Sequence, residues 1–100
     1  MPKLTKAEER KAAADRRAQV TPLKRTMDEA EKRVAKLQAE VARLDAALNA
    51  PDLYAQEPAR AMTLTKQRGE AKKQLDAAEV AWLEASEAYE TARVGVERDA

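Results

Sequence analysis

Cysteine and histidine are both absent from this sequence, and each absence removes a class of chemistry. Without cysteine there is no disulfide framework and no thiolate metal site, a composition that fits a reducing compartment. Without histidine as well, the usual zinc ligands and the usual general base near neutral pH are missing. We therefore expect no metal centre and no catalytic site of these common kinds.

Long apolar runs are also missing, since no stretch approaches the length that a membrane-spanning helix needs. The first residues, MPKLTKAEERK, are charged and so do not resemble a secretory signal. We expect a cytoplasmic protein that does not contact a membrane.

Aromatic residues make up only 3% of the chain, phenylalanine is absent, and there are just two glycines. A β-sandwich or β-barrel needs more β-branched and aromatic residues than this. The chain is instead 44% apolar, largely through alanine, and 37% charged. That composition is typical of long helices and coiled coils. We predict one small all-α domain of 100 residues.

Apolar residues recur in alternating steps of four and three through the first half of the chain. The predicted helix covers 22–49, because Thr21 is a good N-cap residue and Pro22 suits the first helical position. Asn49 and Pro51 end it. The alternation is the heptad seam of a left-handed coiled coil. The seam residues are Leu23, Met27, Ala30, Val34, Leu37, Val41, Leu44 and Leu48.

The same alternation returns in a second predicted helix, 59–97, which follows Pro58. Its seam alternates alanine with large residues, and Arg68 is the one charged member. Trp82 and Tyr89, seven residues apart, are interpreted as core residues rather than as a stacking platform for bases. The seam residues are Ala61, Leu64, Arg68, Ala71, Leu75, Ala78, Trp82, Ala85, Tyr89, Ala92 and Val96.

The segment NAPDLYAQEPAR separates the two seams and holds two of the four prolines. We interpret residues 50–58 as the tip of an antiparallel two-stranded coiled-coil hairpin, in which Leu53 and Tyr54 cap the open end of the seam. Large residues of the first helix then face alanines of the second. A hairpin that satisfies its own seam predicts a monomer. The predicted neighbours are Leu48 with Ala61, Val34 with Leu75, and Met27 with Trp82.

Residues 5–19 form an additional short N-terminal helix in this prediction. Thr5, with Glu8 three residues later, matches a capping box. The apolar face of this helix is mostly alanine, so it can bury little area against the hairpin. We therefore divide the chain into a basic N-terminal linker with a short helix, 1–21, and the coiled-coil hairpin, 22–100.

Charge is distributed unevenly, although the formal net charge is only +1. Residues 1–25 hold eight basic and three acidic side chains, a net charge of +5, and residues 74–100 hold two basic and seven acidic ones, a net charge of −5. The basic segment is either a solvated face that complements the acidic end or a surface that contacts nucleic-acid phosphates. The candidate phosphate contacts are Lys3, Lys6, Arg10, Lys11, Arg16, Arg17, Lys24 and Arg25.

A catalytic motif is not recognisable. The first glycine, in QRGEAKK, stands alone in a helical context and does not form a GxxxxGK[ST] phosphate loop. Carboxylates three residues apart, such as Glu84 and Glu87, are common on charged helices. We expect this chain not to be an enzyme on its own and to hold no cofactor.

Several short motifs resemble the C-terminal coiled-coil domain of ABC-F ATPases, and the Uup type in particular. The strings that carry the resemblance are LDAALNAPDLYAQEPAR and AEVAWLEASEAYE. The sequence departs from the family pattern at Thr5, where serine is usual, and at Lys6, where an aromatic residue is usual. The matching positions are Lys3-Leu4-Thr5, Val20-Thr21-Pro22, Pro51-Asp52-Leu53-Tyr54, Pro58 and Trp82.

This resemblance implies a cytoplasmic bacterial protein in which two nucleotide-binding domains, with their ATP and Mg²⁺, precede the domain. It also implies that the domain binds DNA, with branched DNA or the ribosome and its RNA as the places where the parent ATPase acts. It thus favours nucleic-acid contact by the basic segment. The alternative is a structural arm that positions the ATPase on the ribosome or on a protein partner through Leu53 and Tyr54 at the tip.

Overall fold

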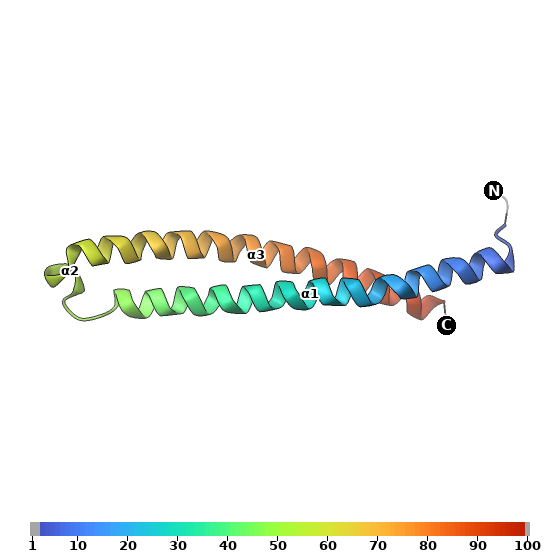
Figure 1. Cartoon of the computed structure of the whole chain (residues 1–100), viewed down its shortest axis with the longest axis horizontal. Helices are drawn as coiled ribbons and strands as arrows, with labels where there is room; N and C mark the ends of the chain where they lie inside the picture. The colour runs from blue at the N-terminus through green and yellow to red at the C-terminus, as the bar shows by residue number, and fades with distance from the viewer. Residues whose placement is uncertain (1–2, 100) are drawn as a thin grey trace.

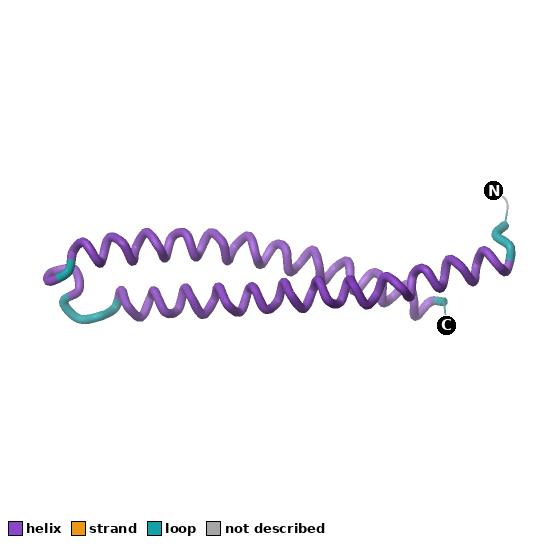
Figure 2. Tube along the Cα trace, viewed as in Figure 1, coloured by secondary structure: helices purple, strands orange, loops and turns teal. Residues whose placement is uncertain are grey.

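The computed structural model describes residues 3–99, which form two long helices and one short helix between them. Helix α1 covers Lys6–Leu48, α2 covers Leu53–Gln56 and α3 covers Pro58–Arg98. No strand occurs in this part of the chain. The molecule is a rod of 76 × 22 × 14 Å (Figures 1 and 2). The prediction of an all-α fold is therefore confirmed.

Helices α1 and α3 lie side by side as the two arms of a helical hairpin (Figure 1). Near the turn, Arg68 of α3 forms an ion pair with Asp45 of α1. At the other end of the rod, Arg16 of α1 forms an ion pair of 2.7 Å with Asp99, which directly follows α3. Residue numbers therefore rise along one arm as they fall along the other.

Helix α1 is continuous through Pro22, so the predicted helix start at Pro22 and the separate short N-terminal helix are both wrong. Proline inside a helix removes one backbone hydrogen bond, to the carbonyl of Ala18. Both Ala18 and Pro22 are exposed, so water can satisfy that carbonyl. The half-buried Val20 and Leu23 on either side continue the seam.

The capping box at the start of α1 is confirmed. The Glu8 backbone N–H donates to the Thr5 hydroxyl at 3.1 Å, and the Thr5 backbone N–H donates to the Glu8 carboxylate at 3.1 Å. The hydrogen bond from the Thr5 backbone also lowers the pKa of Glu8. Two of the free N–H groups of the helix end are thereby paired, and α1 begins at Lys6, as the motif predicts to within one residue.

The turn is built by a left-handed residue and one helical turn. Asp52 has φ of 62°, a conformation that aspartate tolerates better than most residues. It directs Leu53 into the space between the arms, where that side chain is only 5% exposed. Tyr54, the next residue, is 64% exposed. The prediction that both side chains cap the seam is therefore confirmed for Leu53 and wrong for Tyr54.

The core consists of two clusters in the half of the rod nearest the turn. The first joins Leu44, Leu53, Ala61, Leu64 and Ala71, with Leu48 packed against it. The second joins Leu37, Leu75 and Ala78, with Val34 packed against it. The predicted neighbours Leu48 and Ala61, and Val34 and Leu75, thus share clusters. Large residues of α1 do face alanines of α3, as complementary packing requires.

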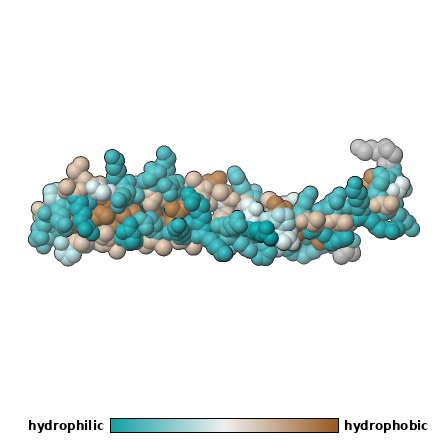
Figure 3. All heavy atoms as spheres, viewed as in Figure 1, coloured by the Kyte–Doolittle hydropathy of each residue, from teal (hydrophilic) through white to brown (hydrophobic). Residues whose placement is uncertain are grey.

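The other half of the rod is packed more loosely. Met27, Ala30, Trp82 and Tyr89 are half-buried rather than buried, and the predicted contact between Met27 and Trp82 stays a prediction. On the face shown in Figure 3, hydrophilic side chains cover most of the rod, and hydrophobic atoms show between them most clearly over the half nearest the turn. Among residues 3–99, no helix has an apolar stretch that could cross a bilayer.

Candidate nucleic-acid interface

The first part of α1 carries a row of lysine and arginine side chains. Because α1 is one unbroken helix, these side chains lie on a single surface. Arg10, Arg17 and Lys24 follow one another at intervals of seven residues, or about 10.5 Å along the helix axis. Lys11 and Arg25 each follow a member of this row. We refer to these five residues, Arg10, Lys11, Arg17, Lys24 and Arg25, as the basic stripe. Had α1 broken at Pro22, the stripe would have been divided between two elements.

Small side chains and distant acids keep the stripe accessible. Ala14, Ala18 and Thr21 lie between its cations and are exposed. Glu8 and Asp15 lie about 140 to 160° around the helix from Arg10, at 100° per residue. Small side chains thus separate the cations, whereas Glu9 and Asp99 line a shallow groove with Arg10 and border the stripe on one side.

Four of the five stripe residues are exposed and have no ion-pair partner among residues 3–99: Arg10, Lys11, Arg17 and Arg25. The fifth, Lys24, donates from Nζ to the Asp28 carboxylate at 3.0 Å, and this hydrogen bond raises the pKa of Lys24. Because that pair is exposed, it holds the lysine only weakly.

Arg16 stands apart from the stripe. Its Nε and Nη2 atoms each donate to the Asp99 carboxylate at 2.7 Å. These hydrogen bonds raise the pKa of Arg16 and lower the pKa of Asp99. Bidentate arginine–carboxylate pairs are well-oriented and strong for their class. The geometry assigns Arg16 to holding the two arms together.

The remaining two predicted contacts, Lys3 and Lys6, are exposed at the start of the chain. Lys6 opens α1 and lies about 40° around the helix from Arg10. Because Asp99 at the end of α3 lies beside Arg16, the part of α1 before Arg16 extends past the other arm (Figure 1). Lys6 and Arg10 line a shallow groove that also contains Glu9 and Asp99, so this end of α1 lies near carboxylates as well.

The acidic end of α3 is partly neutralised within its own helix. Arg93 pairs with both Glu90 and Glu97, and these contacts raise its pKa. The ion pair between Arg16 and Asp99 is the one that joins the basic and acidic ends among residues 3–99. The charge of Arg17 also contributes to lowering the pKa of Asp99. The interpretation of the basic segment as a complement to the acidic end is therefore supported at Arg16 and Arg17, and for the rest of the stripe it stays a prediction.

The tip offers a different kind of surface. Tyr54 is 64% exposed and Met62 is 75% exposed, and both line a shallow groove with Pro58 and Lys66. Leu53 belongs to the core and is not available to a partner. Sequence reasoning missed Met62, although its position next to the seam residue Ala61 on the outer side of the helix could have indicated exposure.

The seam residues singled out in the sequence have structural roles. Arg68 is half-buried and reaches Asp45 on the other arm. Trp82 and Tyr89 are half-buried on the inner side of α3, which supports their interpretation as seam residues. The Trp82 Nε1 and Ser86 Oγ atoms are buried and have no hydrogen-bond partner within residues 3–99. No cluster of acidic side chains suited to a metal ion occurs within the described residues.

A second set of cations, near the turn, was not predicted from the sequence. Arg33 and Lys36 on α1 and Arg60, Lys66 and Lys73 on α3 are all exposed. The acids near them are only partly paired: Glu40 and Asp76 pair within their own helices, whereas Glu29 lines a groove with Arg33.

Comparison with known proteins gives one match. The family model described as ABC transporter C-terminal domain matches residues 22–87. No curated protein and no solved structure matches the chain. The matched range contains both clusters of the core, the whole turn and the facing parts of α1 and α3. The chain belongs to the family of ABC transporter C-terminal domains.

Proposed function

We propose that this chain is a DNA-binding accessory domain of an ABC-F type ATPase, of the Uup type, and that it contacts DNA phosphates through the basic stripe. The family membership supports an accessory domain of an ABC protein. The observation that carries the DNA contact is the continuity of α1 through Pro22, which aligns the stripe on one exposed side of a single helix.

The rest of the proposal follows from this framework. The two arms form an antiparallel coiled coil that is monomeric, because its seam is filled from within the chain. The ATP and Mg²⁺ of such an ATPase belong to nucleotide-binding domains of the parent protein, which works in the cytoplasm. Lys3 and Lys6 extend the stripe toward the start of the chain, and Arg16 contributes by fixing the end of α3.

DNA binding by the basic stripe should rest on contacts to phosphates, so the affinity should fall as the salt concentration rises. On duplex DNA, the slope of log affinity against log salt falls by about 0.9 for each cation that no longer reaches a phosphate. The triple variant R10Q/R17Q/R25Q should thus bind duplex and branched DNA at least about tenfold more weakly at low salt, with a slope reduced by about 2.7. Fluorescence anisotropy titrations at two salt concentrations measure both quantities.

A matched control variant tests whether DNA affinity depends on the position of the cations or only on the net charge of the chain. The variant R43Q/K72Q/R93Q removes the same number of cations, each of which pairs with an acid of its own helix. It should bind DNA with nearly unchanged affinity. Circular dichroism confirms that both variants remain helical. Absence of binding by the natural chain at low salt, or equal losses in both variants, would refute the proposed function.

The tip supports a second candidate function, a structural arm that positions the parent ATPase on the ribosome or a protein partner. The observation in its favour is the pair of exposed apolar side chains, Tyr54 and Met62. The variant Y54S/M62S should weaken co-sedimentation of the chain with ribosomes and leave DNA affinity unchanged. If ribosome binding is the same with and without these side chains, this candidate fails.

A further inference from the structure

The carboxylate of Asp99 lies at the edge of the basic stripe. It accepts hydrogen bonds of 2.7 Å from Nε and Nη2 of Arg16, and Arg16 directly precedes Arg17 of the stripe. The hydrogen bonds to Arg16 lower the pKa of Asp99 most, and the charge of Arg17 lowers it further. Asp99 also lines a shallow groove with Arg10 and Glu9. The chain thus places a carboxylate of its own beside the cations to which we assign DNA phosphates.

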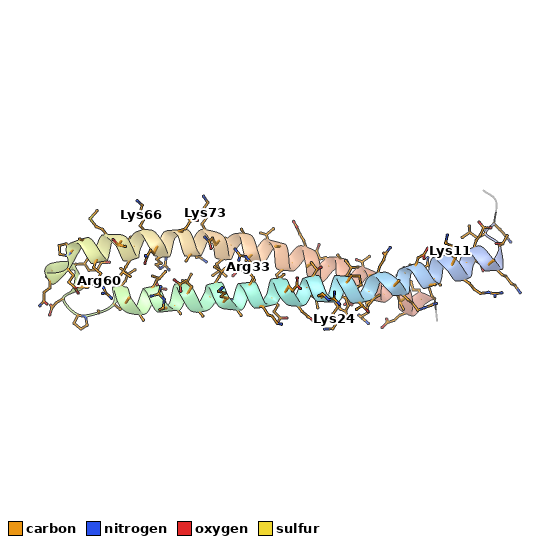
Figure 4. The ribbon with its side chains drawn as sticks, in the orientation of Figure 1. Lys11, Lys24, Arg33, Arg60, Lys66 and Lys73 are labelled. Atoms are coloured by element: carbon orange, nitrogen blue, oxygen red, sulfur yellow. The ribbon has the colours of Figure 1, made fainter. Side chains whose placement is uncertain are left out.

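Arg16 presents to Asp99 a pair of donors that suits a phosphate equally well. Guanidinium groups bind carboxylates and phosphates alike, through two parallel N–H···O hydrogen bonds. The Arg16 side chain is 46% exposed. The stripe residues Lys11 and Lys24 lie in the half of the rod where α3 ends (Figure 4), so DNA on the stripe passes close to this pair. A phosphate on the other edge of the guanidinium would lie beside the Asp99 carboxylate, where two negative charges repel each other.

The end of α3 is held weakly apart from this pair. Asp99 follows Arg98, the last residue of α3, and a carboxylate is unfavourable there because the C-terminal end of a helix carries partial negative charge. The apolar residues of this end, Val94 and Val96, are only half-buried. Exposed ion pairs are weak in general. Arg16 can therefore exchange Asp99 for another anion at little cost.

We propose that Asp99 is an internal competitor of DNA: it holds Arg16 in the free chain, and a phosphate bound along the stripe displaces it. This inference rests on the proposed function, because the displacing phosphate belongs to DNA on the basic stripe. The phosphate offers Arg16 an equivalent partner, and its charge repels the Asp99 carboxylate. Arg16 then joins the DNA contacts, and the end of α3, ordered in the free chain, frays in the complex.

Amide hydrogen exchange tests the release of α3 directly. The natural chain is compared at constant pH and low salt, free and saturated with a short duplex. Exchange at residues 95–98 should be at least about threefold faster in the complex, with little change at Leu75. Binding ordinarily slows exchange, because it stabilises the folded state, so faster exchange is specific to the displacement. In R16Q, which lacks the pair already, DNA should cause no such acceleration.

Two affinity measurements test the competition and the transfer of Arg16. Because one phosphate contact is lost, R16Q should bind duplex DNA with a salt slope reduced by about 0.9. D99N removes the competing carboxylate and should raise the affinity at low salt. E9Q is the matched control, since it removes the same charge from the same groove and leaves the pair between Arg16 and Asp99 in place. The gain from D99N should exceed the gain from E9Q by at least about twofold.

The outcomes separate this inference from the function on which it depends. If the natural chain binds no DNA, the proposed function fails and the inference fails with it. If the chain binds DNA but exchange at residues 95–98 is unchanged or slower in the complex, the inference alone is refuted. It is also refuted by equal gains from D99N and E9Q, which net charge explains, and by an unchanged salt slope in R16Q. Circular dichroism of the three variants confirms that each remains helical.

Discussion

Arg16 and Asp99, 83 residues apart in sequence, are joined by two hydrogen bonds of 2.7 Å at the open end of the hairpin. The side chains around this pair are exposed or only half-buried, in contrast to the turn, where Leu44 and Leu53 are buried. The end of α3 therefore depends on a polar clamp more than on apolar burial.

Removing the ion pair between Arg16 and Asp99 should make the end of α3 less stable and should raise the pKa of the Asp99 carboxyl group. In R16Q, amide hydrogen exchange should accelerate for residues 95–98, with little change at Leu75. The pKa of Asp99, lowered in the natural chain mainly by its hydrogen bonds to Arg16, should rise toward its ordinary value. An NMR titration of the Asp99 carboxyl carbon measures this. An unchanged pKa in R16Q would contradict the assignment.

The ion pair between Arg16 and Asp99 also makes the stability of the end of α3 depend on pH, and stability should fall in acid. Because the pKa of Asp99 is lower in the folded state than in the unfolded chain, its contribution to stability is complete above the unfolded value and is lost as the pH falls through the folded value. The protection of amides 95–98 against exchange, taken relative to the intrinsic rate at each pH, should therefore fall on acidification below about pH 4 in the natural chain. In R16Q this acid-induced change should be much smaller.

The most buried residue of the cluster nearest the turn is Leu44, which is 0% exposed. Leu44→Ala should lower the free energy of unfolding by about 2 to 5 kcal/mol, because it leaves a cavity where the arms cannot collapse freely. Leu83 is 52% exposed, so Leu83→Ala should change it by no more than about 0.5 kcal/mol. Urea titrations followed by circular dichroism compare the two, and equal effects would disprove the location of the core.

Much of this fold could be predicted from periodicity alone. The alternating steps of three and four identify the seams, and the interruption at Asn49 and Pro51 indicates the turn. Together they place Val34 and Leu75 in one cluster, as the structure shows. The pattern could not show which of Leu53 and Tyr54 turns inward, because that depends on the positive φ of Asp52. Nor could a net charge show that Glu40 and Asp76 are each paired within their own helix, with Arg43 and Lys72.

The error at Pro22 has a physical cause and a test. Thr21 and Pro22 are good local signals for a helix start, but seam packing on both sides outweighs them. In a helix interior, proline costs about 3 kcal/mol relative to alanine, and part of that cost is recovered because proline also restricts the unfolded chain. Pro22→Ala should therefore raise the free energy of unfolding by about 1 to 3 kcal/mol. A helix that began at Pro22 would instead be unchanged or destabilised by this substitution.

The turn provides the last prediction. Asp52 adopts φ of 62°, which costs a residue with a side chain about 1 kcal/mol relative to glycine. Asp52→Gly should therefore raise the free energy of unfolding by about 0.5 to 1 kcal/mol, even though glycine makes the unfolded chain more flexible. Asn49, at the other side of the turn, has φ of −87°, so Asn49→Gly brings only the added flexibility and should be destabilising by about 0.5 to 1 kcal/mol. Thermal unfolding of the two variants gives opposite signs if Asp52 holds the turn in the left-handed conformation, and two losses of stability if it does not.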